Sequence, residues 1–224
     1  MSLMASVGHT DYLTMTNRQI EYIVKDQKPL VLSADDTVRS ACRLMRERGA
    51  GSVLITDRRG RLAGIFTGRD AVRLLAKGAD ADHTPLAQAM TRNPAVVGPK
   101  SSALDALRIM AERDCRHVPI VEDGTIRGVV SRRDLKGMEL EEFARQQTGR
   151  PTGATLDRQL TDVIGKAKPF VLPPDKTVQE ACRSMRRRKC GYVLVFDSGG
   201  HLKGIFTGRD AVRVIAEGKA AAHV

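Results

Sequence analysis

The feature that most constrains this chain of 224 residues is a long segment that occurs twice. The ten residues GIFTGRDAVR at 64–73 return unchanged at 204–213. The same spacing holds without a gap when residues 28–80 are aligned with 168–220, and more than half of those positions are identical. A segment that recurs at a fixed spacing is one structural unit made more than once. The sequence therefore indicates a duplication.

A more diverged copy lies between the two. Thr37, Ala41 and Met45 align with Ser102, Ala106 and Met110, and the segment 64–70 aligns with 128–134. We predict a leader and N-terminal extension (1–17), a first repeat (18–83), a second repeat that pairs with the first (84–138), a linker (139–157) and a third repeat (158–224). The partner of the third repeat is expected outside this chain, either in a fourth repeat or in the third repeat of a second copy.

Each repeat has the pattern of a β-α-β-β-α unit, which predicts a mixed α/β (α+β) fold. A short apolar strand (31–32, 96–97 or 171–172) precedes a helix capped by Thr37, Ser102 or Thr177. In the first copy the apolar positions of this helix follow the i, i+3, i+4, i+7 spacing. Two strands follow, at 53–55 and 62–66, and a second helix begins after Thr67. One such unit leaves its small sheet uncovered, so we expect the units to pack in pairs.

Composition limits the function classes without choosing one. Lys and Arg number 37 against 26 Asp and Glu, so the net charge is +11, which permits nucleic acid or small anions as partners and also fits a plain basic surface. No apolar stretch is long enough to span a membrane. The four cysteines form no C-x-x-C pair, Cys42 and Cys182 fit buried helical positions, and no metal site is expected. A cytoplasmic location is therefore expected.

The densest recurring motif is Gly-h-h-Ser/Thr-x-x-Asp, where h is apolar, at a predicted strand-to-helix junction. It contains these pairs: Thr67 and Asp70, Ser131 and Asp134, Thr207 and Asp210. A Ser/Thr cap followed by an acid three residues later is a capping box, worth about 1 kcal/mol without any ligand. The same geometry attracts phosphate at a helix start. An arginine precedes each Asp (Arg69, Arg133, Arg209), which favours an anion site.

Together these motifs and the strand His117–Val121 resemble the CBS domain family, named for cystathionine beta-synthase. The resemblance extends from about Arg18 to Gly218. It implies tandem pairs, called Bateman modules, that bind adenine nucleotides or adenosyl ligands and regulate a partner. The proline of the family's strand is present as Pro119, but the first and third repeats have Leu54 and Leu194 there, which affects the expected base contacts.

The resemblance also implies residue roles. One cleft would combine Thr67 and Asp70 with Ala95 and Cys115–Arg116, and the other would combine Ser131 and Asp134 with Leu30 and Ala50–Gly51. The Asp side chains would hold ribose hydroxyls, and the Thr and Ser side chains would face the sugar or α-phosphate. The residues expected to line the base are Ile65, Val129 and, in the third repeat, Ile205. The candidates for compensating the phosphate charge are Arg69, Arg116 and Arg133. The alternative is that these three arginines are solvated surface side chains without a ligand role. Arg209 occupies the corresponding position in the third repeat.

The expected function is a non-catalytic regulatory module that senses AMP, ADP, ATP or S-adenosylmethionine and signals to an unknown protein by a conformational change. No cofactor is required, and a homodimer formed through the repeats is expected. The alternative is a nucleic-acid-binding protein on the same scaffold, suggested by the charge and by Arg186–Lys189. An enzyme is not expected, because the sequence has no P-loop, nucleophile elbow or metal triad.

Overall fold

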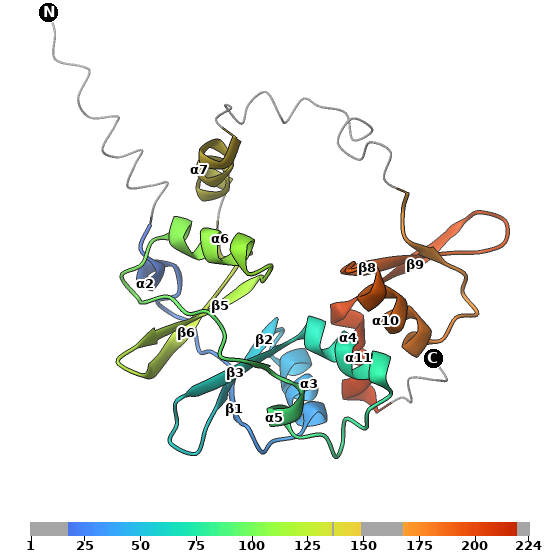
Figure 1. The fold of residues 1–224 in the computed structure, drawn as a ribbon, viewed down its shortest axis with the longest axis horizontal. Helices are drawn as coiled ribbons and strands as arrows, with labels where there is room; N and C mark the ends of the chain where they lie inside the picture. Colours follow the sequence, from blue (N-terminus) through green and yellow to red (C-terminus); the bar gives the residue numbers. More distant parts are fainter. Residues whose placement is uncertain (1–17, 136, 149–167, 219–224) are drawn as a thin grey trace, which may run out of the picture. The chain divides into compact units, whose positions relative to one another are not determined.

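The computed structural model describes residues 18–135, 137–148 and 168–218, and the chain divides into two compact units (Figure 1). One unit contains residues 1–28 and 95–167, and therefore most of the predicted second repeat together with the first residues of the predicted first repeat (18–28). The other contains residues 29–94 and 168–224, and therefore most of the first and third repeats together with residues 84–94, which the sequence analysis assigns to the second repeat. The expected leader (1–17) lies outside the described residues, as does the linker from residue 149 onward.

The first repeat forms a four-stranded sheet with three helices, and residues 86–92, which the sequence analysis assigns to the second repeat, complete this sheet instead. Its elements are β1 (Val31–Ser33), α3 (Val38–Glu47), β2 (Ser52–Thr56), β3 (Leu62–Thr67), α4 (Gly68–Lys77), α5 (Leu86–Ala89) and β4 (Thr91–Arg92). The sheet order is β1-β2-β3-β4, with β1 parallel to β2 and the other neighbours antiparallel. Helix α3 begins as predicted, because the Thr37 hydroxyl accepts a hydrogen bond from the Ser40 amide. Its predicted apolar face (Val38, Ala41, Cys42, Met45) is buried.

The third repeat has the same elements without the last two. They are β7 (Val171–Leu172), α10 (Val178–Arg187), β8 (Tyr192–Phe196), β9 (Leu202–Thr207) and α11 (Gly208–Glu217). The sheet order is β7-β8-β9, and its strand register reproduces that of β1, β2 and β3 position by position. Thr177 caps α10, as predicted, in a capping box with Glu180. The pKa of Glu180 is lowered to about 2, mainly by the hydrogen bond from the Thr177 amide. Hydrogen bonds from the Lys176 ammonium and the Thr177 hydroxyl add to this shift.

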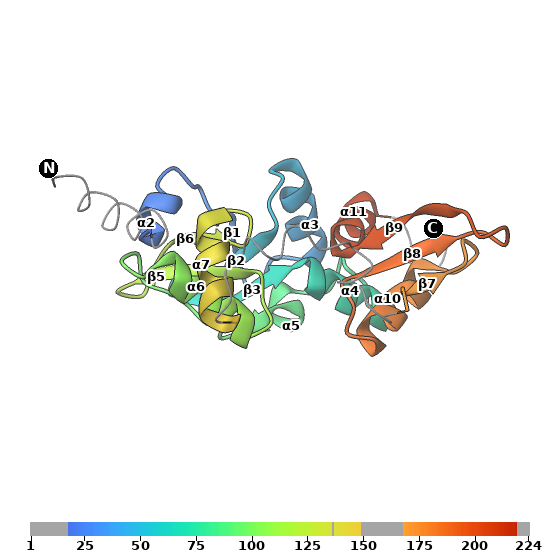
Figure 2. The same cartoon turned by 90° about the horizontal axis from the view of Figure 1, so that it is seen from above.

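The helices of the first and third repeats pack against one another, which the sequence-based expectations did not include. Helix α4 lies against α10 and α11, and α11 also lies against α3 (Figure 2). Their apolar faces share one core, in which Ala71, Val72, Ala211 and Val212 are buried. At the first residue of α4 the backbone of Gly68 meets that of Gly208, the first residue of α11, so closely that a Cβ would collide.

Arginines tie the ends of these helices together. Arg39 and Arg43 of α3 donate hydrogen bonds to the carbonyls of Ile215 (3.0 Å) and Ala216 (3.5 Å), near the end of α11. Arg183 of α10 donates to the Ala76 carbonyl (3.0 Å), near the end of α4. A cation at a helix C-terminus satisfies carbonyls that lack helical partners and complements the helix dipole. Arg43 and Arg183 are equivalent positions of the two repeats, and so are the carbonyls of Ala76 and Ala216 to which they donate. The packing of the first repeat on the third therefore has approximate twofold symmetry.

The unit with the second repeat has its own core. It contains α2 (Ile20–Ile23), α6 (Ala103–Glu112), β5 (His117–Glu122), β6 (Thr125–Ser131) and α7 (Gly137–Thr148). Ser102 caps α6 as predicted, and the predicted helical extension at 138–147 is present as α7. The predicted strand at 96–97 is wrong: Val97 forms only an isolated bridge with Ile120. Prolines at 94 and 99 and a glycine at 98 confine this segment, since proline has no amide hydrogen for a ladder.

Candidate functional site

The motif of the first repeat is a capping box in which both carboxylate oxygens of Asp70 have protein partners. The Asp70 carboxylate accepts hydrogen bonds from the Thr67 amide (2.8 Å) and hydroxyl (2.9 Å), which makes the capping box that opens α4. Its second oxygen accepts from Thr91 of β4 (3.1 Å) and lies 2.7 Å from Arg73. The side chain is only 2% exposed. Asp70 therefore has a complete set of protein partners and acts as a structural residue in this conformation.

The motif of the third repeat is more open. Asp210 accepts from the Thr207 amide (2.9 Å) and hydroxyl (2.8 Å), and Arg213 lies 3.0 Å from its other oxygen. Within the described part of this repeat no hydroxyl occupies the place that Thr91 takes beside Asp70. The Asp210 side chain is accordingly 22% exposed. This carboxylate can accept a further hydrogen bond from a ligand.

The motif of the second repeat does not stand at a strand-to-helix junction, so that expectation is wrong for Ser131 and Asp134. Asp134 still accepts from the Ser131 amide (2.6 Å), but residues 132–135 form a turn and α7 begins only at Gly137. Gly137 occupies the position of Arg73 in the first repeat. Glycine weakens a helix there and supplies no guanidinium to the carboxylate.

A cross-strand neighbour accompanies each motif, and the sequence analysis did not assign it a role. Ser52 lies opposite Thr67, His117 opposite Ser131, and Tyr192 opposite Thr207. Directly opposed residues of an antiparallel pair project from the same face of the sheet. Burial lowers the pKa of His117, and the nearby Asp134 charge opposes this shift only in part. The strand register of each hairpin is the signal that could have identified these three residues, because it places them opposite the Ser or Thr of the motif.

A cavity of about 400 Å³ lies at the start of β8, the strand that pairs with β9 of the third motif. Its lining residues are Lys168, Phe170, Arg188, Cys190 and Tyr192. The Arg188 guanidinium lies over the Phe170 ring, 4.8 Å from its centroid, in a cation–π contact. The cavity is therefore lined by two aromatic rings and two cations, and one of the rings, Tyr192, lies opposite Thr207. Phe170 and Cys190 correspond to Leu30 and Ala50, so the internal alignment was the signal that could have found it.

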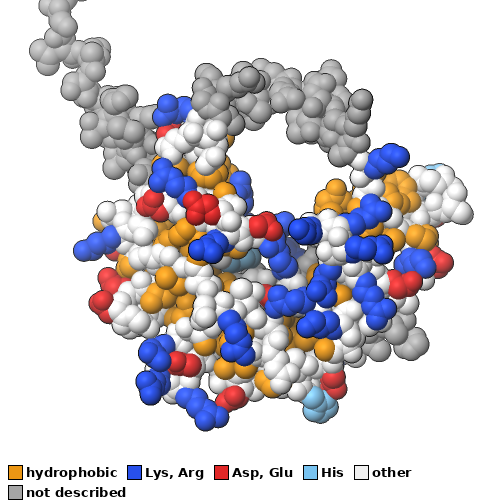
Figure 3. Space-filling model, viewed as in Figure 1, with side chains coloured by type: hydrophobic (Ala, Val, Ile, Leu, Met, Phe, Trp, Pro, Cys, Tyr) orange, Lys and Arg blue, Asp and Glu red, His pale blue; other side chains and the backbone are white. Residues whose placement is uncertain are grey.

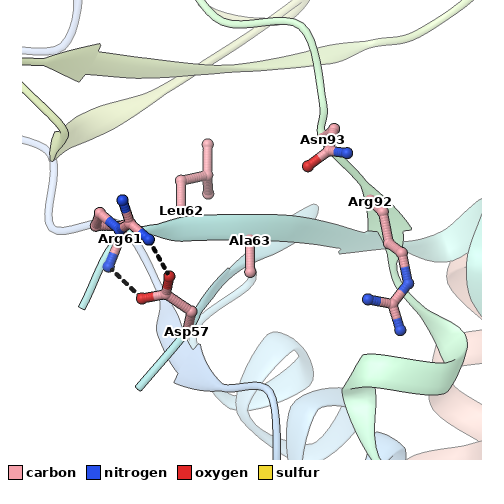
Figure 4. A pocket seen from close by; sticks show the side chains of 6 residues that line it. All are labelled: Asp57, Arg61, Leu62, Ala63, Arg92 and Asn93. Atoms are coloured by element: carbon pink, nitrogen blue, oxygen red, sulfur yellow. Dashed lines mark hydrogen bonds and ion pairs between the residues drawn. The ribbon is translucent and has the colours of Figure 1, made fainter. Parts of the chain in front are cut away.

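A second cavity, also of about 400 Å³, lies beside the β2–β3 turn (Figure 4). Its lining residues are Asp57, Arg61, Leu62, Ala63, Arg92 and Asn93. The Asp57 carboxylate accepts from the amides of Arg59 and Arg61 (2.9 Å each) and pairs with the Arg61 guanidinium at 3.3 Å. The Arg61 amide is the main cause of the lowered pKa of Asp57. This carboxylate holds the turn, and none of the predicted site residues lines the cavity.

The other predicted residues are placed as follows. Leu30 and Ile65 are buried, whereas Ile205 is 57% exposed. Ala95 and Val129 are half-buried, and Gly51, Arg69, Arg116, Arg133 and Arg209 are exposed. The Gly68–Gly208 contact brings the motifs of the first and third repeats together at the starts of α4 and α11. The two clefts expected between the first and second repeats take residues from both units and stay a prediction.

The positive charge has a structural use. Figure 3 shows Lys and Arg side chains gathered over α4 and α10. Of the arginines on the packed helices, Arg39, Arg43 and Arg183 donate to helix-end carbonyls, and Arg46 pairs with Glu217 at 3.2 Å. These side chains hold the first and third repeats together, so their charge is not evidence for nucleic acid. No described helix is long and apolar enough to span a membrane.

Comparisons with known proteins agree with the repeats. The family model for the CBS domain matches residues 21–77, 86–139 and 161–217. A CBS domain-containing protein of Arabidopsis thaliana is 29% identical over 223 aligned residues, which cover 85% of this chain and 39% of the plant protein. The chain thus spans about two fifths of that relative.

Two solved structures are similar. A protein of Methanocaldococcus jannaschii, proposed as an archaeal homologue of γ-AMPK, has a TM-score of 0.66 at 18% identity and covers 88% of this chain and 72% of its own. At that identity the match shows the fold alone. A CBS domain protein of Pyrobaculum aerophilum in complex with AMP has a TM-score of 0.52 at 25% identity, covering 56% of this chain and 98% of its own.

Proposed function

The chain belongs to the CBS domain family, and from that premise we propose that it is a non-catalytic regulatory module that binds an adenine nucleotide or a related adenosyl ligand. The observation that supports the proposal is the open cavity of the third repeat, which is lined by aromatic rings and cations, together with the partly exposed Asp210 carboxylate of the same repeat. The AMP complex of the Pyrobaculum protein supports the choice of ligand class.

The chemistry of this cavity, which we call the repeat-3 cavity, fits the parts of a nucleotide. Tyr192, which is 41% exposed, offers apolar, polarisable surface to a purine, whereas Phe170 is buried beneath Arg188 and positions that guanidinium. Lys168 and Arg188 offer positive charge to a phosphate, and Arg188 is already oriented by its contact with Phe170. Asp210 does not line the cavity, but it accepts hydrogen bonds from Thr207, the residue opposite Tyr192. Its carboxylate can accept hydrogen bonds from a ribose diol, because its protein partners leave it 22% exposed.

Regulation would follow from where this cavity lies. The third motif opens α11, and α11 packs on both helices of the first repeat that border the shared core. A ligand that contacts this region differently in two arrangements of the helices shifts the balance between them. We propose that a partner protein reads this shift, and that the charge of +11 serves helix contacts and small anions rather than a nucleic acid.

Calorimetric titration with AMP, ADP, ATP and S-adenosylmethionine tests the proposal. We expect saturable heat from at least one ligand and a clear loss of affinity in Tyr192→Ala and Asp210→Asn. Arg61→Ala, at the other cavity, is the matched control and should bind like the wild type. Absence of heat with all four ligands at millimolar concentration would contradict the proposal. A steeply salt-dependent complex with DNA or RNA would favour the alternative function.

A further inference from the structure

The four helices that join the first and third repeats end on charged residues, and the sign of the charge differs between the two helix pairs. Helices α3 and α11 pack on each other and end on Glu47 and Glu217. Helices α4 and α10 also pack on each other, but they end on Lys77 and Arg187. The two pairs are related by the repeat, since α3 corresponds to α10 and α11 to α4. One pair thus carries cations at the positions where the other carries carboxylates.

The carboxylate of α11 is matched by an arginine. Arg46 of α3 pairs with Glu217 at 3.2 Å. In the other helix pair, Arg186 occupies the position of Arg46 and Lys77 that of Glu217. The equivalent arginine-to-carbonyl hydrogen bonds hold both helix pairs in the same arrangement. Arg186 and Lys77 therefore bring two like charges together where the related pair has an ion pair.

A further cation occupies a backbone conformation that disfavours it. Lys189, two residues beyond the end of α10, has a φ of 52°, in the left-handed region. The corresponding residue of the first repeat is Gly49, with a φ of 61°, and glycine adopts this region without a steric penalty. A lysine has such a penalty, because its Cβ approaches the following carbonyl oxygen. The chain thus carries this positive charge at a conformational cost, and strain of this kind is concentrated at functional sites.

We call Lys77, Arg186, Arg187 and Lys189 the basic cluster. All four residues are exposed, and α4 and α10 are the helices over which Figure 3 shows Lys and Arg side chains gathered. Within the described residues no carboxylate pairs with any of the four. The carboxylates that follow α4 or begin α10 have other partners: Asp80 pairs with His83, Asp82 with Arg39, and Glu180 with Lys176.

The helix dipole does not account for the basic cluster. A cation in the last turn of a helix is favourable, yet α3 and α11 end on carboxylates under the same dipole. The helix contact does not require cations either, because Glu217 shows that a glutamate fits at the position of Lys77. Like charges in contact are destabilising. An anion from outside the helix pair would therefore complete the basic cluster.

We propose that the basic cluster binds an acidic segment of a partner protein, with carboxylates one helical turn apart. The chain itself shows the fit, since a glutamate in the last turn of one helix reaches Arg46 on another. Arg186 and Arg187 can each hold a carboxylate through two parallel N–H donors. A nucleic acid fits less well, because the four cations are confined to two helix ends and no aromatic side chain belongs to the cluster. The proposal rests on the proposed function only in identifying the bound protein as the regulated partner.

Fluorescence anisotropy with the full chain, without nucleotide and at low salt, tests this. The probe is a labelled alanine-rich helical peptide with glutamates at i, i+4 spacing, and the control probe has glutamine at those positions. We expect saturable binding of the glutamate peptide alone. Lys77→Glu combined with Arg187→Glu should weaken this binding about tenfold or more, because both new carboxylates repel the probe.

The double variant should fold, because each substitution introduces the residue that the first repeat or its partner helix has at the equivalent position. Its melting temperature should be unchanged or higher, since Arg186 then meets a glutamate as Arg46 does. The matched control is Lys25→Glu combined with Lys100→Glu, which changes the net charge equally at exposed positions outside the cluster. This control should bind the glutamate peptide like the wild type.

Equal binding of the two probes, or no binding of either, would overturn the proposal. Equal losses in the two double variants would do so too, because net charge and not the basic cluster would then attract the probe. A DNA duplex or a phosphatidylserine vesicle that binds through the cluster, while the glutamate peptide does not, would assign the cluster to that polyanion instead. The peptide experiment needs no nucleotide, so it can fail while nucleotide binding in the repeat-3 cavity stands.

Discussion

The contact between Gly68 and Gly208 gives a sharp prediction about the pairing of the first and third repeats. A Cβ on Gly68 would lie 2.8 Å from the Gly208 carbonyl oxygen, 2.9 Å from its carbonyl carbon and 3.2 Å from its Cα. All three atoms are backbone, so no side chain can turn away to make room. Gly68→Ala therefore forces α4 and α11 apart, and such overpacking costs about 1–3 kcal/mol. Alanine's better helix propensity offsets at most about 1 kcal/mol of this.

We expect Gly68→Ala to lower the free energy of unfolding by about 1–2 kcal/mol, and the melting temperature by roughly 2–8 °C for a chain of this length. Urea unfolding followed by far-UV circular dichroism measures this. The matched control is Gly137→Ala, since Gly137 is also the first residue of a helix but a Cβ there meets nothing within 4 Å. If Gly68→Ala is as stable as that control, α4 and α11 do not meet as described.

Three further predictions concern single side chains. Because the pKa of His117 is lowered from 6.5 in the folded state, the unfolded state binds its proton more readily, and stability should fall as the pH drops below about 6.5; urea midpoints at several pH values should show a flatter profile for His117→Gln. Burial raises the pKa of Cys42 and of Cys182 to about 12, so both thiols should resist iodoacetamide until the protein is unfolded, as peptide mass spectrometry can check. Asp70→Ala should cost about 3 kcal/mol, since it removes a buried carboxylate that Arg73 and the hydroxyls of Thr67 and Thr91 contact, whereas Asp210→Ala should cost about 1 kcal/mol; similar urea midpoints for the two variants would contradict the difference in burial.

Local signals predicted much of the fold. Thr37, Ser102 and Thr177 begin helices as their type and position indicate, since a hydroxyl that accepts an amide hydrogen is a property of a few neighbouring residues. The failures have local causes too. The repeat alignment predicts a helix directly after Ser131, as after Thr67, but residues 132–135 form a turn and the helix begins only at Gly137.

Contacts between distant segments were harder to predict. The apolar stripe of α11 indicates that this helix is covered, but a stripe does not name its partner, and α3 and α4 lie far away in the sequence. The same holds for the repeat-3 cavity. Phe170 and Arg188 are brought together by the fold of the repeat, whereas each alone reads as a core residue or a surface cation.

The alkylation rate of Cys190 tests the central claim most directly, because this half-buried thiol lines the repeat-3 cavity. Iodoacetamide labelling of the wild-type chain, with and without saturating AMP, is followed residue by residue by mass spectrometry. The account predicts that AMP slows labelling of Cys190, and that Tyr192→Ala abolishes the protection. Labelling of Cys190 at the same rate with and without AMP, in a chain that binds AMP by calorimetry, would contradict binding in this cavity.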